Sequence, residues 1–234
     1  MPRKSTKRAQ TPTPPPAPSP ARAMVYVVDD DPSVRRSLLR LLHASGYQAE
    51  AFASGYEFLN RRFTTVMTGA THAPPAAAEC LVLDVCMPAM SGLALQEELA
   101  RRDDILPIVF ITGHGDVPTS VRAMKQGAVD FLTKPCDQQE LHHAIATAIH
   151  RNQLMQQMQQ RQREAARKLT ALTAREREVL ARVASGAPNK QIATDLSIRE
   201  PTVKVHRARV MQKLGVTSVA ELVRLVDSAP LRAK

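Results

Sequence analysis

Four apolar stretches of the sequence each end in a polar side chain of a type that could do chemistry. Three aspartates, residues 29–31, follow AMVYVV, and Asp84 ends CLVLD. Thr112 ends LPIVFIT, and Lys134 follows VDFLT. A lone carboxylate such as Asp84 is costly to remove from water unless it lies at a strand end or has a cationic partner. We therefore expect these residues to gather in one polar site.

Such a set could bind a metal ion and transfer a phosphoryl group. Clustered carboxylates repel one another and recruit a hard divalent cation, which we expect to be Mg²⁺. One carboxylate can then attack phosphorus, while the metal and Lys134 neutralise the transferred group and Thr112 hydrogen-bonds its oxygens. Asp31 precedes Pro32 and has an alternative role, which we favour, as the N-cap of a helix. Singly, Thr112 and Lys134 would be ordinary strand-end residues, so the joint placement carries the prediction.

The elements that must position these residues alternate between strands and helices. Such alternation predicts a doubly wound α/β fold with a five-stranded parallel sheet, whose ligand crevice lies at the carboxyl ends of the strands. The small-residue and Pro-rich segment 64–79 is predicted to be a loop. The predicted strands are residues 23–28, 47–52, 80–84, 106–112 and 129–135, and the predicted helices are residues 33–46, 54–63, 91–103, 116–128 and 137–152.

Charge divides the chain into an acidic and a basic part. Residues 1–23 carry five cations and no acid and are Pro-rich, which predicts a disordered tail. Residues 24–150 carry 10 cations against 15 acids, whereas residues 167–234 carry 14 cations against 6 acids. This asymmetry favours a cation site in a first domain, residues 24–150, and a polyanion partner for a basic domain, residues 169–230. The polar, Gln-rich residues 151–168 are predicted to form a helical linker.

Several classes of protein are disfavoured. Aromatic residues make up 3% of the chain, which argues against an aromatic-lined pocket for an organic ligand. The three cysteines lack the spacing of a metal site, and we expect them to be reduced in a cytoplasmic protein. No apolar run approaches the ~20 residues of a membrane span, so we expect no membrane association. The Pro-rich start lacks the apolar segment of a signal peptide.

The motifs VVDDDP, LVLDVCMPAMSG and FITGHGDVPTSVRAMKQGAVDFLTKP resemble the receiver domain of two-component response regulators, over about residues 24–150. The last motif is most similar to the FixJ-type branch. The resemblance implies that Asp84 is the phospho-acceptor. It also implies that Asp29 and Asp30 hold Mg²⁺, with Asp84 and the backbone carbonyl of Cys86 as further ligands.

The same resemblance assigns three further roles. Thr112 and Phe131 would form a switch pair, Lys134 would pair with the phosphoryl group, and the Lys134–Pro135 bond would be cis. The chain departs from the family in its long 64–79 loop and in Cys86, a position that often holds a larger side chain. The haloacid dehalogenase phosphatases also use an Asp nucleophile but need Asp-x-Asp, and Cys86 occupies the second position. We therefore expect that the chain is not an enzyme and catalyses only its own phosphorylation and the slow hydrolysis of the resulting phosphoryl group.

The last part of the chain reads as short helices only. Thr173 and Glu176 fit a capping box, and four short helices with a basic surplus indicate a helix-turn-helix unit. On the helix of about residues 201–214, one face is predicted to be core. The core face holds Val203, Val210 and Leu214, and the opposite face holds Lys204, Val205, Ala208, Arg209 and Gln212. The opposite face suits the major groove, where Lys can reach guanine and Val a thymine methyl.

Residues 169–230 resemble the LuxR-type helix-turn-helix output domain, carried by LTAREREVLARVASGAPNKQIATDLSIREPTVKVHRARVMQKLGV. The departures are Arg199 and Pro201, where the family usually has a Ser cap and an Arg, and Ala208, often a Lys. We expect fewer DNA contacts as a result. The start of the preceding helix is placed for phosphate contacts. The expected DNA-binding residues are Asn189, Lys190, Thr202, Lys204, Val205 and Arg209.

Together these features predict a phosphorylation-dependent transcriptional response regulator. A sensor histidine kinase would phosphorylate Asp84, remodel the face that carries Met124, Lys125 and Asp130, and favour a homodimer that binds double-stranded promoter DNA. RNA polymerase is a further expected partner. The alternative is a DNA-binding regulator that works without phosphorylation and uses its first domain as a protein-interaction module. The intact set of acidic-site residues argues against that alternative.

Overall fold

The computed structural model describes residues 23–68, 78–113 and 117–228, and the chain divides into two compact units, Met1–Gln153 and Leu154–Lys234. The predicted disorder of residues 1–23 falls outside the described residues except at Ala23, where it is wrong: Ala23 is buried in the core, and its carbonyl oxygen accepts from the backbone N–H of Gln48. Within the described ranges, no helix is long and apolar enough to cross a membrane.

A five-stranded parallel sheet forms the centre of the first unit, as the alternating pattern predicted. Its strand order is β2-β1-β3-β4-β5, so the chain begins at an inner strand and winds outward in both directions. Every pair of neighbouring strands is parallel. The strands are β1 Met24–Val28, β2 Gln48–Phe52, β3 Glu79–Asp84, β4 Ile108–Thr112 and β5 Asp130–Thr133.

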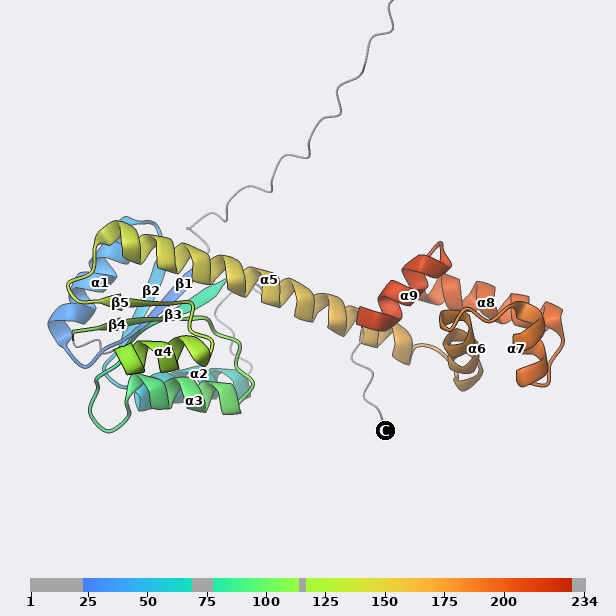
Figure 1. Cartoon of the computed structure of the whole chain (residues 1–234), viewed down its shortest axis with the longest axis horizontal. Coiled ribbons are helices and arrows are strands. Elements are labelled where there is room, and N and C mark those ends of the chain that lie inside the picture. Colours follow the sequence, from blue (N-terminus) through green and yellow to red (C-terminus); the bar gives the residue numbers. More distant parts are fainter. Residues whose placement is uncertain (1–22, 69–77, 114–116, 229–234) are drawn as a thin grey trace, which may run out of the picture. The chain divides into compact units, whose positions relative to one another are not determined.

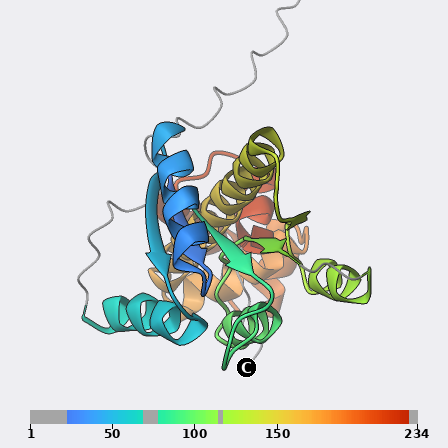
Figure 2. The same cartoon turned by 90° about the vertical axis from the view of Figure 1, so that its left-hand side faces the viewer.

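Helices cover both faces of this sheet (Figures 1 and 2). Two of them, α1 Pro32–Ala44 and α5 Gln138–Thr170, begin in the first unit and lie on one face. The other face carries α2 Gly55–Thr68, α3 Gly92–Arg101 and α4 Val117–Lys125. Because both faces are covered, the strands can be apolar throughout, which is why the sequence shows unbroken Val- and Leu-rich runs rather than alternation.

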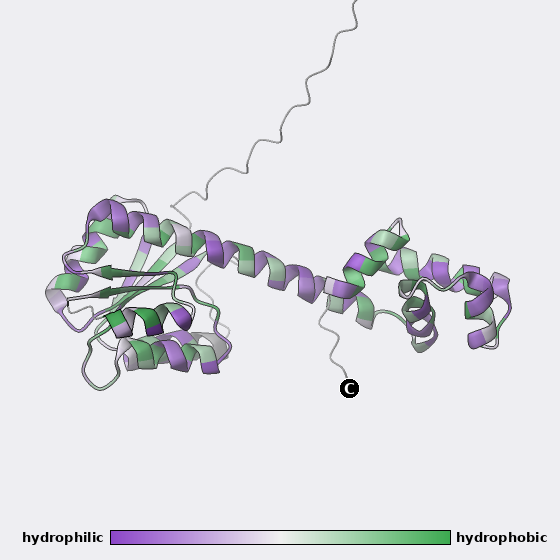
Figure 3. Ribbon diagram, viewed as in Figure 1, coloured by the Kyte–Doolittle hydropathy of each residue, from purple (hydrophilic) through white to green (hydrophobic). Residues whose placement is uncertain are grey.

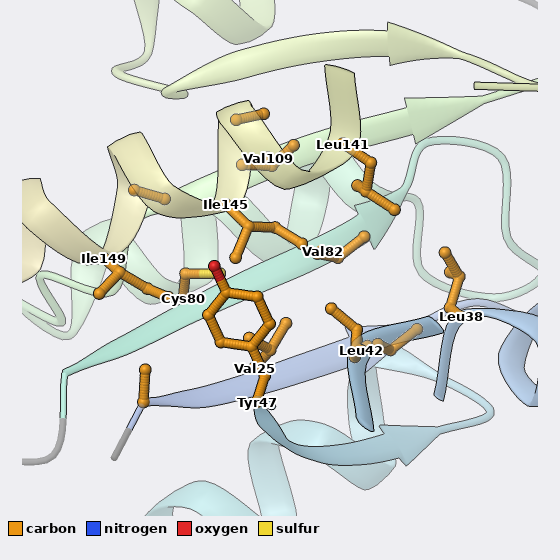
Figure 4. Close-up of a cluster of buried hydrophobic side chains, with 14 of the residues drawn as sticks. Val25, Leu38, Leu42, Tyr47, Cys80, Val82, Val109, Leu141, Ile145 and Ile149 are labelled. Atoms are coloured by element: carbon orange, nitrogen blue, oxygen red, sulfur yellow. The ribbon is translucent and has the colours of Figure 1, made fainter. Parts of the chain in front are cut away.

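Each face of the sheet has its own hydrophobic cluster. On one face Val25 and Val82 pack against Leu42 of α1 and Ile145 of α5, all almost fully buried (Figure 4). On the other face the side chains of β3 and β4 meet α2, α3 and α4. The largest fully buried side chains of that second cluster are Phe58, Leu81, Leu83, Leu95, Leu99 and Phe110.

The prediction of a loop over residues 64–79 was wrong at both ends. Helix α2 continues to Thr68, and β3 already begins at Glu79. The residues TTVMT include four that are β-branched, which lowers helix propensity by only a few tenths of a kcal/mol each. The first Gly or Pro after Phe63 is Gly69, so nothing in the sequence stops the helix earlier. Residues 69–77 lie outside the described part.

A polar network ties the start of β3 to its neighbours. Arg62 of α2 pairs with both carboxylate oxygens of Asp104 and, at 3.2 Å, with Glu79. The hydroxyl of Tyr26 donates to Glu79 at 3.0 Å, and the backbone N–H of Glu79 donates to Oδ1 of the buried Asn152 at 3.0 Å. These groups are satisfied together at the end of β3 that lies away from Asp84.

Helix α5 is one continuous helix of 33 residues. It includes residues 138–152 of the predicted helix 137–152 and the whole predicted linker 151–168, and it contains no Gly or Pro that would end it. Four helices follow in the second unit, in agreement with the predicted pattern: α6 Ala174–Ala184, α7 Asn189–Asp195, α8 Glu200–Leu214 and α9 Val219–Ser228.

The second unit is a small all-helical bundle with its own core. The central side chains Val179, Ile192, Val203, Leu214 and Leu222 are at most 1% exposed. The capping box at the start of α6 is present in both directions between Thr173 and Glu176, as predicted. Its helices carry both hydrophobic and hydrophilic residues, as expected of helices with one face on a core and one face exposed (Figure 3).

Candidate functional site

The predicted acidic site forms at the carboxyl ends of the strands. Asp29 and Asp30 directly follow β1, and Asp84 is the last residue of β3, the strand next to β1. One carboxylate oxygen from each of the three lies within 4.8 Å of the others. Asp29 and Asp84 are buried, whereas Asp30 is exposed. The three carboxylates therefore form one cluster, of which Asp30 is open to solvent.

Lys134 supplies the cation of this site. Its Nζ donates to Oδ2 of Asp29 at 2.5 Å and to Oδ1 of Asp84 at 3.0 Å. Its backbone N–H donates to the carbonyl oxygen of Thr112 at 2.6 Å, so the end of β4 fixes the chain that carries the amine. The Lys134–Pro135 peptide bond is cis, as predicted.

The electrostatics of the site favour an additional cation. Burial raises the pKa of Asp84, and the charges of Asp29 and Asp30 act in the same direction, against the lowering effect of Lys134. Burial alone would lower the pKa of Lys134, but hydrogen bonds to Asp29 and Asp84 outweigh it, so its pKa is raised. Three carboxylates and one ammonium leave the ionised site with an excess of negative charge.

The loop after β1 holds the carboxylate of Asp29 in place. Oδ1 of Asp29 accepts from the backbone N–H of Asp31 at 2.9 Å, and Nη1 of Arg35 donates to the backbone carbonyl of Asp29 at 2.6 Å. Asp31 itself caps α1, because its Oδ1 accepts from the backbone N–H of Ser33 at 2.7 Å. The structural role favoured for Asp31 is confirmed. Sequence reasoning missed Arg35, for which the sequence offers no specific signal.

Thr112 and Phe131 lie on the two strands next to the acidic site. Thr112 is fully buried at the end of β4, one residue beyond Ile111, which pairs with Asp84. Phe131 of β5 is partly exposed, and its ring lies 6.1 Å from that of Phe110. Their action as a switch pair stays a prediction.

Residues beyond Asp84 complete the surroundings of the acceptor strand. Cys86 is exposed, and its role as a backbone ligand of the metal stays a prediction. Gly92, the first residue of α3, was missed by sequence reasoning. A Cβ there would lie 2.3 Å from the backbone oxygen of Asp84 and 3.0 Å from the ring of Phe110. Only glycine therefore lets α3 begin this close to Asp84, and its place in MSG, soon after the apolar strand, was the available signal.

In the second unit, α8 has the two predicted faces. Val203, Val210 and Leu214 are buried, which confirms the predicted core face. Val205 is 48% exposed, an unusual position for a large apolar side chain. The other face is exposed throughout and holds Thr202, Lys204, Val205, Ala208, Arg209 and Gln212. The division into faces is confirmed, whereas contact with DNA stays a prediction.

Asn189 and Lys190 are the first two residues of α7, the helix that precedes α8 in the sequence. Lys190 is exposed, and Asn189 is partly buried. Oδ1 of Asn189 accepts a hydrogen bond from Nη1 of Arg207 on α8 at 2.8 Å. Sequence reasoning placed Asn189 and Lys190 toward phosphate but missed Arg207, since no motif signals a contact across 18 positions.

Two family models match the chain, one for each unit. Residues 25–146 match the response regulator receiver domain, and residues 170–226 match the bacterial regulatory proteins of the luxR family.

Individual relatives match across most of the chain. Nodulation protein W of Bradyrhizobium diazoefficiens is 42% identical over 91% of this chain and 88% of its own length. The transcriptional regulatory protein FixJ of Azorhizobium caulinodans is 39% identical over 86% of this chain and 90% of its own. The solved structure of the response regulator StyR is 46% identical, with a TM-score of 0.74, and covers 88% of this chain and 98% of its own.

Proposed function

This chain belongs to the transcriptional response regulators that join a receiver domain to a LuxR-type helix-turn-helix domain, and from that premise we propose that a sensor histidine kinase phosphorylates Asp84 to control DNA binding. The observation that carries this proposal is the geometry at Asp84. Its carboxylate ends a buried strand, 3.0 Å from the ammonium of Lys134 and beside two further carboxylates.

The transfer step assigns a role to each of three side chains. A carboxylate oxygen of Asp84 forms the new bond to phosphorus, while the bond from phosphorus to the histidine nitrogen of the kinase breaks and leaves its electron pair on that nitrogen. Lys134 neutralises the oxygens of the arriving group, and the hydroxyl of Thr112 donates a hydrogen bond to one of them.

The donor set at the site fits Mg²⁺. Three carboxylates within 4.8 Å of one another are hard oxygen ligands with excess negative charge, and one of them, Asp30, is exposed to an entering ion. Asp29, Asp30, Asp84 and the backbone carbonyl of Cys86 would hold the ion. When bound, it offsets the negative charge that otherwise repels a phosphodonor.

Phosphorylation would be communicated through Thr112 and Phe131 to α4 and β5. The added phosphoryl charge rearranges the site locally. The neighbouring surface has two conformations, and this rearrangement increases the population of the one that can dimerise. Helix α4 supports this role because it already exposes Val117, Val121 and Met124, each at least 44% accessible. The face that carries Met124, Lys125 and Asp130 would then be the interface of a homodimer.

In the dimer, the second unit would bind paired half-sites of promoter DNA. Helix α8 offers Lys204, Val205 and Arg209 to the major groove, and Thr202, Asn189 and Lys190 flank them toward the phosphates. Regulation of transcription makes RNA polymerase the next partner. The protein must reach both the promoter and the phosphorylated histidine of the kinase. The proposed location is therefore the cytoplasm.

The test is phosphorylation by a small phosphodonor such as acetyl phosphate, followed by intact mass spectrometry. The wild-type chain should gain one phosphoryl group in the presence of Mg²⁺ and little after chelation. Asp84→Asn should gain none while its circular dichroism remains unchanged. If Asp84→Asn takes up the group at the wild-type rate, the acceptor is misassigned, and the regulator that works without phosphorylation at this site becomes the better account.

A further inference from the structure

A side-chain hydrogen bond connects α7 and α8 outside their apolar core. Nη1 of Arg207 donates to Oδ1 of Asn189 at 2.8 Å, and both residues are partly buried. Arg207 lies one turn after the core residue Val203, whereas Lys204 and Ala208 beside it are exposed. Arg207 therefore points toward α7 rather than away from the bundle with the exposed face of α8.

The chemistry of this pair fixes the orientation of the Asn189 amide. A guanidinium has five N–H donors and no acceptor, so it can bind only the carbonyl oxygen of an amide. The amide nitrogen Nδ2 and its two N–H donors must then face away from Arg207. An asparagine amide without such a partner can present either atom, because the two orientations have the same shape.

We propose that Arg207 is a positioning residue for DNA binding, which holds Asn189 so that Nδ2 donates to a backbone phosphate beside the ammonium of Lys190. This inference rests on the proposed function in DNA binding. Amide groups are common phosphate ligands, and such contacts fix the orientation of the protein on the duplex. A reversed amide would present its oxygen to the phosphate and repel it.

The experiment is a double-mutant cycle with the full-length protein. Arg207→Met removes the donors but keeps the aliphatic stem, Asn189→Ala removes the amide, and the third variant carries both changes. The probe is a mixed-sequence DNA duplex at low salt, because phosphate contacts do not depend on sequence. Arg224→Ala is the matched control, since it removes a cation from the exposed surface of α9.

Each single variant should bind this duplex about tenfold more weakly, as expected for the loss of one hydrogen bond to a charged group. The double variant should be at most about twofold weaker than either single variant, because both changes remove the same contact. Arg224→Ala should change the affinity by less than about twofold. Arg207→Lys, which keeps a donor and the charge, should restore most of the affinity.

Losses that multiply in the double variant would show that Arg207 contacts DNA by itself, and would overturn the inference alone. Wild-type affinity in Arg207→Met would overturn it as well. A wild-type chain that does not bind duplex DNA would overturn the proposed function and this inference with it.

Asn189→Asp separates positioning from contact. The aspartate still accepts from Arg207, so the melting temperature of the second unit should be maintained or raised. It has no N–H to donate and carries a negative charge, so its affinity for the duplex should fall below that of Asn189→Ala. The added charge repels DNA in any case, so the melting temperature is the deciding measurement: a fall to that of Asn189→Ala would show that Arg207 does not hold the side chain at position 189 as proposed.

Discussion

The ammonium nitrogen of Lys134 lies 3.0 Å from Oδ1 of Asp84, although 50 positions separate the two residues in the chain. The same nitrogen lies 2.5 Å from Oδ2 of Asp29. Lys134 therefore occupies the carboxylate oxygens that a divalent cation would also use. It both competes with the metal and supplies charge to an arriving phosphoryl group, and these two effects have opposite signs.

Lys134→Met should separate these effects. Without the ammonium, Mg²⁺ should bind more tightly, since a like charge near the site is removed. Phosphoryl uptake at saturating Mg²⁺ should nevertheless slow by at least about tenfold, because a preorganised charge on the phosphoryl oxygens is lost. Isothermal titration calorimetry and mass spectrometry measure the two quantities. Lys125→Met, on the exposed surface of α4, is the control. Unchanged uptake in Lys134→Met would remove Lys134 from the chemistry.

Gly92→Ala should destabilise the first unit by about 1–3 kcal/mol, because its Cβ would meet the backbone oxygen of Asp84, which cannot move away cheaply. Gly113→Ala is the control, since a Cβ there meets nothing within 4 Å. Its stability should change by about 0.5 kcal/mol or less. All three tyrosines of the chain lie in the first unit, so tyrosine fluorescence during urea unfolding of the full chain reports on that unit. Equal stabilities of the two variants would contradict the prediction.

Lys204 and Lys190 should respond differently to replacement by alanine. Lys204 lies on the exposed face of α8, so Lys204→Ala should cost about 1–3 kcal/mol at a preferred site and weaken sequence preference. Lys190→Ala should weaken binding to all sequences alike and reduce the slope of log affinity against log salt by about one. Fluorescence anisotropy over a salt series with selected and scrambled duplexes measures both. If both variants lose only non-specific affinity, α8 does not read the bases.

The second unit should lose stability in acid through Glu176. Hydrogen bonds from the ammonium of Lys213 and from the backbone N–H of Thr173 lower the pKa of Glu176 to about 2. A carboxylate with a lowered pKa stabilises the fold above its ordinary pKa of 4.5, and this contribution disappears as the pH falls from 4.5 toward 2. The melting temperature of the wild type should therefore be higher than that of Glu176→Gln at pH 7. The difference between the two melting temperatures should shrink as the pH falls from 4.5 toward 2.

Far-UV circular dichroism of the full chain follows the loss of helix in both units, and tyrosine fluorescence, which comes from the first unit alone, identifies by difference the transition of the second unit. Glu178→Gln is the matched control on the same helix. Glu178 is paired with Arg175 at the surface, where an ion pair contributes little, so this variant should melt close to wild type at pH 7. A difference between Glu176→Gln and wild type that persists at pH 2 would contradict the assignment.

The fold and the acidic site were largely predictable because strand ends are visible in the sequence. Each buried strand is an unbroken apolar run, and the residue that ends it must reach solvent or a partner. Asp84 and Lys134 could therefore be assigned to one edge of the sheet before their contact was known. The end of α2 could not be assigned in this way, since TTVMT carries no stop signal and the helix continues to Thr68.

Contacts between side chains of different elements were not predictable. The bond between Arg207 and Asn189 depends on how α7 packs on α8, and neither residue type is unusual on a basic helical surface. Gly92 carried a weak signal only, because a glycine at a helix start has several ordinary explanations. The distance to the backbone of Asp84 distinguishes a steric requirement from a capping preference.

Strand β3 has an acid at each end, Glu79 and Asp84, and fully buried apolar residues between them. If β3 paired with its neighbours one residue out of step during folding, Glu79 would leave Tyr26 and Arg62, and Asp84 would leave Lys134. Every apolar side chain between them would also change faces. A misaligned sheet is thus penalised at both ends and along its length. Asp84, the proposed phospho-acceptor, therefore also favours the correct register of β3, the central strand of the sheet.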